Sequence, residues 1–160
     1  MCISKEILLL RKANINDESL LFNWANDPDV RKWSFNKKII SLSEHKVWFN
    51  RKLTNKNIII WILESSNTPA GMVRFEKKED KILLNYLIAP HWRGQRLASN
   101  MLTMAMIELN NYWKNIKVLA YTLPENIASI KSLEKAGFSF ENSSTEKKCY
   151  VFSNVENQCK

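Results

Sequence analysis

The chain has 160 residues, the length of one ordinary domain with its own hydrophobic core. Hydrophobic residues make up 45% of it and charged residues 25%, which excludes a disordered chain, and no apolar stretch approaches the ~20 residues that a membrane span requires. The formal net charge of +8 favours an anionic partner, but the basic residues are dispersed or paired rather than gathered in an arm, which disfavours nucleic acid.

The cysteines, the histidines and the N-terminal segment favour a cytoplasmic protein without a metal site. Three cysteines lie at wide spacings that suit neither a disulfide framework nor a metal site: Cys2, Cys149 and Cys159. His45 and His91 have no cysteine or acidic cluster at ligand spacing. The apolar run 7–10 is too short for a secretory signal and lacks the small-residue cleavage site.

The first third of the chain predicts a strand and two helices. Residues 6–13 carry a continuous aliphatic run, as a buried strand would. Apolar residues then recur at helical spacing, with a cap at Asn16 or Asp17 and an end at Asp27-Pro28. Ser43 is the N-cap that we expect for a second helix with one apolar stripe.

The middle third predicts three antiparallel strands. Residues 58–63 are β-branched and aromatic, and the turn-forming residues 65–69 lead to a returning strand over 70–77. A second turn at 79–80 leads to residues 82–89, which are apolar nearly throughout and therefore typical of a central strand.

The last third alternates helices and strands, and it completes an α+β order of mixed character. The expected elements are a long helix over 96–112, a strand over 116–122, a helix over 124–136 stopped by Gly137, and two closing strands over 138–140 and 148–152. We expect one domain over residues 1–160, with residues 154–160 as a frayed tail.

The segment between the central strand and the long helix has the outline of an anion site. The strand ends at Pro90, a short basic loop follows, and a helix begins. A helix N-terminus presents unpaired backbone N–H groups and roughly half a positive charge. The loop over residues 93–98 could therefore cradle a pyrophosphate, and Gly94 would let its backbone approach closely.

Two motifs together resemble motifs A and B of the GCN5-related N-acetyltransferases (GNAT). The first is an R-G-x-x-x-A loop over residues 93–98, after a strand that ends in Ala-Pro. The second is N-x-A-S over residues 126–129, followed by E-K-A-G-F over residues 134–138. The resemblance spans roughly residues 8–152 and implies the GNAT fold, a twisted, mostly antiparallel sheet of six to seven strands flanked by about four helices.

The resemblance also implies acetyl-CoA as co-substrate, in a gap between the strand ending near Ala89 and the strand over 118–122. Backbone groups at the end of the first strand would hold the pantetheine arm, and the loop and helix start would hold the pyrophosphate. The cofactor-binding residues that it implies are Leu87, Ile88, Arg93, Gly94, Gln95, Arg96, Leu97, Ala98, Ser99, Asn126 and Ser129.

Two positions depart from the family's pattern. Arg96 stands where the loop usually has a second glycine, so either the backbone avoids a positive φ there or the family's main-chain geometry is distorted. Leu133 stands where the family frequently has a tyrosine as general acid. The CoA thiolate, with a pKa near the ~8.5 of a simple thiol, then either leaves with little acid assistance or takes a proton from Tyr121 or Tyr86.

We expect a neutral amine to attack the thioester directly, without an acyl-enzyme intermediate, so that positioning supplies most of the rate. The backbone N–H of Ile88 would stabilise the developing oxyanion. A carboxylate or a water chain would remove the ammonium proton, and Glu76 and Glu64 are the weak carboxylate candidates, each more often a surface charge.

The acceptor segment has a likeness of its own, in W-x-N-x-P-x-V-R over residues 24–31 and H-x-x-W-F over residues 45–49. It resembles two GNAT subgroups: the amino-sugar acetyltransferases of the pseudaminic-acid pathway, which is the closer match, and the enzymes that acetylate ribosomal-protein N-termini. In the sugar interpretation, Phe35 and Trp48 would offer aromatic faces, Arg31 would meet a phosphate, and His45 would hydrogen-bond or help to move a proton. The alternative is that Trp24 and Trp48, which lie at helical spacing with other apolar residues, belong to the core and that His45 is structural.

Three functions remain open on these residues. A nucleotide-linked amino sugar as acceptor predicts a closed basic pocket, which the net charge favours. A protein N-terminal acetyltransferase predicts an acidic groove open at both ends. A non-catalytic acyl-CoA-binding module is suggested by Leu133. The partner that we expect is a small-molecule amine rather than a nucleic acid or a membrane, and the protein would be a monomer or a homodimer.

Overall fold

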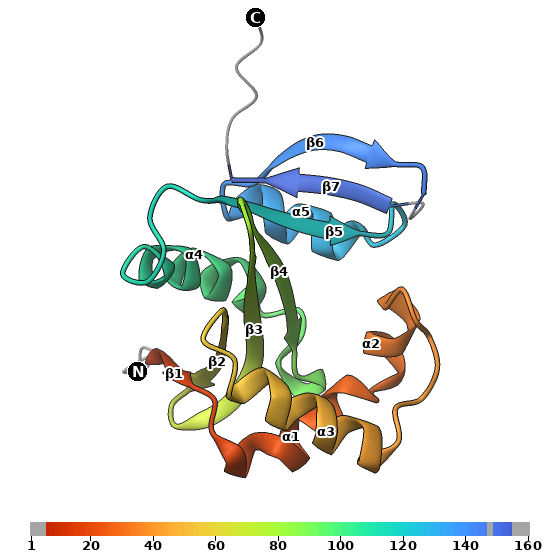
Figure 1. The fold of residues 1–160 in the computed structure, drawn as a ribbon, viewed down its shortest axis with the longest axis vertical. Coiled ribbons are helices and arrows are strands. Elements are labelled where there is room, and N and C mark those ends of the chain that lie inside the picture. The colour runs from red at the N-terminus through yellow and green to blue at the C-terminus, as the bar shows by residue number, and fades with distance from the viewer. Residues whose placement is uncertain (1–5, 147–148, 155–160) are drawn as a thin grey trace, which may run out of the picture.

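The computed structural model describes residues 6–146 and 149–154 (Figure 1). Within these residues, seven strands form one sheet in the order β1-β2-β3-β4-β5-β7-β6. Neighbouring strands pair antiparallel, except for the parallel pair β4 and β5. The strands are β1 (Leu8–Lys12), β2 (Ile58–Ser65), β3 (Thr68–Lys78), β4 (Lys81–Ile88), β5 (Lys117–Thr122), β6 (Ser139–Ser144) and β7 (Cys149–Ser153). The predicted mixed α+β architecture is confirmed.

The helices divide between the two faces of the sheet. They are α1 (Glu18–Ala25), α2 (Pro28–Trp33), α3 (Leu42–Leu53), α4 (Leu97–Leu109) and α5 (Ile127–Lys135), with short 3₁₀ turns η1 (Ile15–Asp17) and η2 (Pro90–Trp92). Figure 1 shows α1 to α3 at one end of the molecule and α4 beside the centre of the sheet. Within the described residues, no helix combines the length and the apolar character needed to cross a membrane.

The start of α2 is a feature that the sequence patterns did not predict. Asp27 and Pro28 end α1, as expected, but they also begin α2: the Asp27 side chain accepts a hydrogen bond from Val30 N–H (3.2 Å), and Pro28 occupies the first turn. The next helix, α3, is capped by Ser41 rather than by Ser43, through a reciprocal capping box with Glu44. Three helices therefore precede β2 instead of two.

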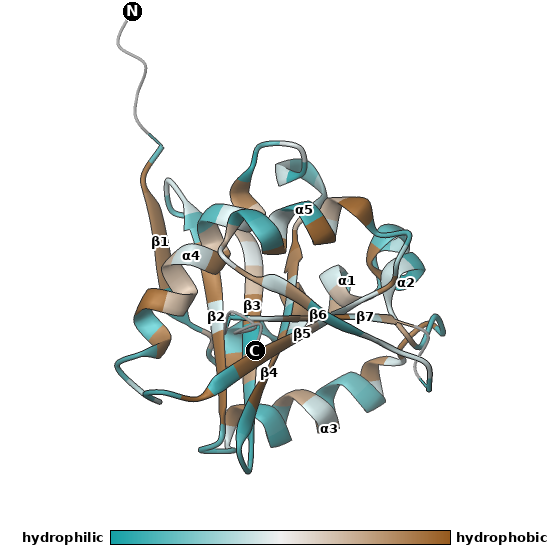
Figure 2. Ribbon diagram, turned by 90° about the horizontal axis from the view of Figure 1, so that it is seen from above, coloured by the Kyte–Doolittle hydropathy of each residue, from teal (hydrophilic) through white to brown (hydrophobic). Residues whose placement is uncertain are grey.

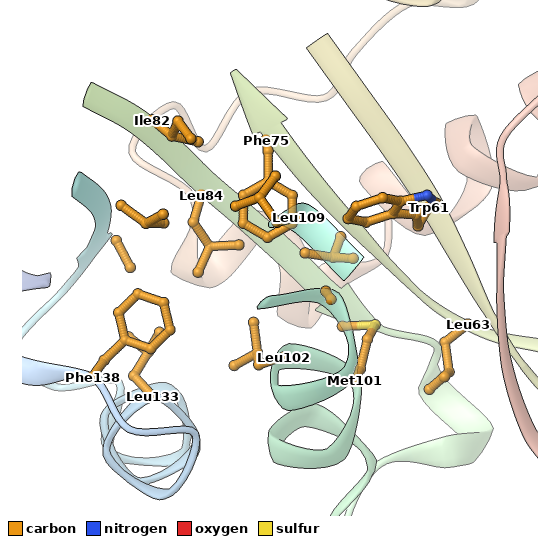
Figure 3. Packing of buried hydrophobic residues seen from close by; sticks show 14 of the residues in the cluster. Trp61, Leu63, Phe75, Ile82, Leu84, Met101, Leu102, Leu109, Leu133 and Phe138 are labelled. Carbon is orange, nitrogen blue, oxygen red and sulfur yellow. The ribbon is translucent and has the colours of Figure 1, made fainter. Parts of the chain in front are cut away.

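Alternation along the strands produces a core on each side of the sheet. In β2, Trp61 and its neighbours at odd positions join the cluster under α4 and α5, whereas Ile60 and Ile62 join the cluster under α1 and α3. Figure 3 shows Met101 and Leu102 of α4 directed toward Phe75 and other residues of the sheet. Hydrophobic residues follow the strands in Figure 2, which agrees with a sheet covered on both faces.

The parallel pair β4 and β5 separates before either strand ends. Their pairing runs from Lys81↔Lys117 to Leu84↔Ala120, yet β4 continues to Ile88 and β5 to Thr122. On its other edge β5 remains paired with β7 throughout this stretch. The two strands visibly part in Figure 1, and backbone groups of β4 beyond Leu84 lose their partner strand on that side.

The C-terminal segment is ordered further than expected. Asn154 was predicted to begin a frayed tail, but its side-chain oxygen accepts a hydrogen bond from Val118 N–H (2.8 Å) and its own N–H donates to Val118 O (3.3 Å). Residues 155–160, Cys2 and Cys159 lie outside the described residues. Cys149 is buried in β7.

Candidate active site

A cavity of about 640 Å³ lies where β4 and β5 part. One wall comes from α1, α2, α3 and the segment between α2 and α3, and the other from the ends of β4 and β5 and the first turns of α5. The four predicted acceptor residues all line it: Arg31, Phe35, His45 and Trp48. Six of the cofactor residues implied by the resemblance also line it: Leu87, Ile88, Arg93, Ala98, Asn126 and Ser129. Segments far apart in the sequence thus meet at one site.

The remaining cofactor candidates form the loop and the helix start beside this cavity. Gly94, Gln95 and Arg96 are exposed. Leu97 and Ser99 are buried in the first turn of α4, where Ser99 Oγ donates a hydrogen bond to Arg96 O (3.2 Å). No side chain caps the N-terminus of α4 in the part of the chain that the structure describes, so the N–H groups of that turn stay open to a ligand.

The backbone at Arg96 has the positive φ that the family's glycine would adopt at this position. Its φ is 60° and its ψ is 15°, which is the left-handed region that favours glycine. Gly94 also has a positive φ, of 77°. The chain therefore keeps the positive φ at Arg96 with a side chain that disfavours it, so the loop stores backbone strain.

Arg93 directs its side chain away from the loop and toward α2. Its Nη2 is 2.6 Å from Asp27 Oδ1, its Nη1 is 3.0 Å from Asp29 Oδ2, and its Nε donates to Ile88 O (3.2 Å). Burial alone would raise the pKa of Asp27, but the hydrogen bond from Arg93 and the helix-capping N–H groups give a net lowering. Arg93 thus connects the start of α2 to the end of β4, and its own N–H donates to Pro90 O (3.4 Å), so neither its side chain nor its N–H is free for a pyrophosphate.

Tyr86 bridges β4 and α5 across the gap between the strands. Its hydroxyl lies 2.9 Å from Ser129 Oγ. Burial raises the pKa of Tyr86 above its usual value, against a smaller opposite effect of hydrogen bonds with Ser129 and Ser132. Leu133 is buried at the wall of the same cavity, one helical turn after Ser129. Tyr121 lines the cavity from β5.

The predicted acceptor residues differ in how many hydrogen bonds their side chains already make within the protein and in how exposed they are. Arg31 donates to the carbonyls of Asn36 (3.0 Å) and Lys38 (3.2 Å) and to Ser34 Oγ (3.0 Å), so its guanidinium organises the segment after α2. Phe35, on that segment, is 55% exposed.

His45 is only 2% exposed, and its Nε2 lies 3.1 Å from Glu18 O. Its ring stacks on Phe49 at 5.8 Å and tilts against Phe22 and Trp48. Burial lowers the pKa of His45, so the neutral form dominates at pH 7. This placement matches a residue that holds α1 and α3 together.

The two weak base candidates, Glu76 and Glu64, do not line the cavity. Glu64 is in an ion pair with Arg11 (2.6 Å), near the β1 edge. Glu76 accepts from Lys52 Nζ on both oxygens (2.8 Å each). Burial would raise the pKa of Glu76, but its cationic neighbours lower it overall, so it is a poor base.

Sequence reasoning missed Arg74, which lines the cavity from β3. The signal was present, because Arg74 interrupts an otherwise apolar run from Ala70 to Phe75 at a position that shares a face with the buried Met72. Within the described residues, no group of three or more histidine, cysteine, aspartate or glutamate side chains could hold a metal ion.

Comparison with known proteins identifies the family. Residues 8–139 match the family model described as "Acetyltransferase (GNAT) domain". The chain therefore belongs to the GNAT acetyltransferase family, and it is an acetyl-CoA-dependent N-acetyltransferase with the GNAT fold. A comparison with curated proteins finds no match.

Solved structures agree on the fold. A domain from Methanocaldococcus jannaschii DSM 2661 is 25% identical, with 93% of this chain and 98% of that chain covered and a TM-score of 0.78. Spermidine N-acetyltransferase from Vibrio cholerae, in complex with CoA and spermine, is 18% identical (91% and 92% covered, TM-score 0.78). Aminoglycoside acetyltransferase AAC(6')-Ib, in complex with coenzyme A and kanamycin, is 17% identical (92% and 93% covered, TM-score 0.79).

Proposed function

We propose that the acceptor of this acetyltransferase is the primary amine of a nucleotide-linked amino sugar. The observation that carries the proposal is the charge of the cavity wall. Three arginines line it, Arg31, Arg74 and Arg93, whereas Asp29 is the one carboxylate among the described lining residues and is already paired with Arg93. A polyamine or another polycation would meet net repulsion there, and an acceptor with phosphates would meet attraction.

Acetyl-CoA would occupy the gap between β4 and β5, with its pyrophosphate at the loop over residues 93–98. Ala89 N–H donates to Ala70 O of β3 (2.9 Å). Because successive residues of a strand direct their N–H groups to alternate sides, the N–H of Ile88 faces the gap. This orientation supports the assignment of the Ile88 N–H as the donor that would hold the thioester oxygen and stabilise the oxyanion formed during attack. Leu87, Asn126 and Ser129 would complete the walls of the pantetheine channel.

The neutral amine would attack the thioester carbon directly, forming the C–N bond and an oxyanion, and the collapse of that intermediate would break the C–S bond and release CoA as a thiolate. Because Glu76 and Glu64 do not line the cavity, a water chain would take the proton that the amine loses. We assign the protonation of this thiolate to Tyr86. Its hydroxyl is held by Ser129, one turn of α5 before Leu133, the position at which a tyrosine is expected. β4 would thus supply the proton-donating hydroxyl that α5 lacks at Leu133. Tyr121 of β5 is the second candidate for the proton donor.

An acceptor screen tests the proposal. Acetylation would be followed by the release of CoA, with an amino-sugar nucleotide, an N-terminal peptide and a polyamine offered at equal concentrations. The highest kcat/KM is expected for the amino-sugar nucleotide. A higher value for the peptide would replace the proposal with protein N-terminal acetylation. Acetyl-CoA binding in calorimetry without turnover of any amine would show a non-catalytic acyl-CoA-binding module.

A further inference from the structure

Arg74 is a largely buried cation on the wall of the cavity. Its side chain is 18% exposed and lines the cavity wall from β3. The guanidinium carbon lies 5.0 Å from the centre of the Trp48 ring, another lining residue, so the two side chains form a cation–π contact. This pair stands on the acceptor side of the cavity, among residues of α1 and α3.

The contacts of Arg74 leave its hydrogen-bonding capacity unused. Its Nε is 2.9 Å from Glu76 Oε1, but the N–H is not directed at that oxygen, so the contact is an ion pair rather than a hydrogen bond. Nothing in residues 6–146 and 149–154 accepts a hydrogen bond from Nη1 or Nη2. A guanidinium has five N–H donors in a fork that matches the oxygens of a phosphate or carboxylate.

The charge around Arg74 is not balanced by the protein. The Glu76 carboxylate forms ion pairs with Lys52 Nζ (2.8 Å), Arg74 Nε (2.9 Å) and Lys78 Nζ (3.7 Å), so one negative charge faces three positive charges. Burial lowers the pKa of the Arg74 guanidinium, with Glu76 opposing that effect only in part. A cation removed from water at such a place costs free energy unless a further anion joins it.

The terminal nitrogens of the other two arginines of the cavity are already hydrogen-bonded or ion-paired within the chain, although the Nε of Arg31 has no partner among the described residues. Arg31 donates to Asn36 O, Lys38 O and Ser34 Oγ, and Arg93 is paired with Asp27 and Asp29. Of the three, Arg74 is therefore the one whose terminal nitrogens remain available to a ligand.

We propose that Arg74 binds a phosphoryl group of the acceptor, with Trp48 beside it, and so determines which amines are acetylated. The inference rests on the proposed acetyl transfer to an amino-sugar nucleotide and deepens it by naming the residue that recognises the anionic part. Arg74 would act in specificity rather than in bond formation, because the thioester is assigned to the end of β4.

Steady-state kinetics with two matched acceptors test this assignment. One is an amino-sugar nucleotide and the other is the same amino sugar without phosphate. In Arg74→Gln, KM for the nucleotide-linked acceptor should rise about ten- to a hundredfold, as expected for a lost charge-assisted bidentate contact. KM for acetyl-CoA and for the phosphate-free acceptor should not change. Arg74→Lys should recover part of the loss, since it keeps the charge but not the fork.

Arg51→Gln is the matched control, because Arg51 is an exposed cation of α3 that does not line this cavity. It should leave the preference for the phosphorylated acceptor unchanged. An equal loss on both acceptors in Arg74→Gln would show a structural role, and an unchanged preference would show that another group reads the phosphate. Either outcome overturns the assignment, while acetylation of amines by the unaltered enzyme would still stand.

A binding experiment keeps the assignment testable if no acceptor turns over or if the variants fold poorly. The unaltered protein, with its cofactor site saturated by CoA, should bind uridine diphosphate in calorimetry, and the nucleotide should compete with any acceptor that is acetylated. Absence of binding to the unaltered protein would overturn the role of Arg74, whether or not acetyl transfer is observed. Binding that survives Arg74→Gln in a folded variant would do the same.

Discussion

At the scale of single residues, the loop before α4 combines strain with charge. Arg96 adopts the left-handed conformation that costs a residue with a side chain roughly 1 kcal/mol, and we expect its guanidinium to interact with the pyrophosphate of the cofactor. The family's glycine would relieve the strain and remove the charge. The affinity for acetyl-CoA and the stability of the fold should therefore move in opposite directions when Arg96 is replaced by glycine.

Arg96→Gly should raise the free energy of unfolding by up to about 1 kcal/mol, because the gain in backbone conformation exceeds the entropy cost of a new glycine. Acetyl-CoA affinity should fall several-fold. Denaturant unfolding and calorimetry measure the two effects. Arg96→Ala is the control, since it removes the charge but keeps the strain: affinity should fall without a gain in stability. Unchanged affinity in both variants would show that Arg96 does not reach the cofactor.

Tyr86→Phe should lower kcat by about a hundredfold, the usual contribution of a positioned proton donor, with little change in the dissociation constant of acetyl-CoA. Tyr121→Phe, measured beside it, is expected to have the smaller effect. If Tyr121→Phe gives the larger loss of kcat, the proton donor belongs to β5 rather than to β4. If neither changes kcat, the thiolate leaves without acid assistance.

The sequence predicted which residues lie at the site better than it predicted which partners their side chains bind. The motifs placed eleven candidates at the cofactor site, and the gap between β4 and β5 does bring many of them to one cavity. The sequence could not show that the Arg93 side chain is paired with Asp27 and Asp29, because that contact joins segments 66 and 64 residues apart. Arg74 was overlooked for a related reason: its value depends on which partners surround it in space.

At the scale of elements, periodicity predicted the strands and the long helices, but α2 was missed. The pair Asp27-Pro28 is ambiguous, since aspartate and proline both stop a helix and begin one. The structure uses them for both purposes. This helix is also the element that Arg93 attaches to β4, so the missed element connects the acceptor wall to the cofactor loop.

Asp27→Asn therefore gives a sharp test of that connection. Asparagine still caps α2, so the free energy of unfolding should fall by less than about 1 kcal/mol, but the ion pair with Arg93 is lost. KM for the acceptor should rise while the dissociation constant of acetyl-CoA stays nearly constant. Asp29→Asn is the milder control, because Asp29 is 66% exposed and solvent already weakens its pair. Equal effects of both changes on acetyl-CoA binding would argue against a separate acceptor wall.

At the scale of the whole molecule, the site exists because the parallel strands β4 and β5 stop pairing before they end, while β4 stays paired with β3 and β5 with β7. The order of strands predicts that α4 crosses between β4 and β5, since parallel neighbours need such a connection. The residue at which their pairing stops does not follow from local pattern, because it depends on how β7 holds β5 and how β3 holds β4.

Gly71 shows how tightly β3 holds the end of β4. A Cβ at Gly71 would lie 2.9 Å from Leu87 O, 3.0 Å from Ile88 Cδ1 and 3.2 Å from Met101 Sδ, and the backbone oxygen cannot move cheaply. Gly71→Ala should lower the free energy of unfolding by about 1–3 kcal/mol through overpacking, as measured by denaturant unfolding. It should also weaken acetyl-CoA binding several-fold, because the strand that moves is the one that carries Leu87 and Ile88.

Thr68→Ala, at the exposed start of the same strand, is the control and should change neither quantity appreciably. A loss of stability in Gly71→Ala with unchanged acetyl-CoA affinity would separate the end of β4 from the cofactor. A loss of both stability and acetyl-CoA affinity would show that the packing of α4 against β3 and β4 sets the distance between β4 and β5. The core on one face of the sheet would then control cofactor binding at the point where these two strands part.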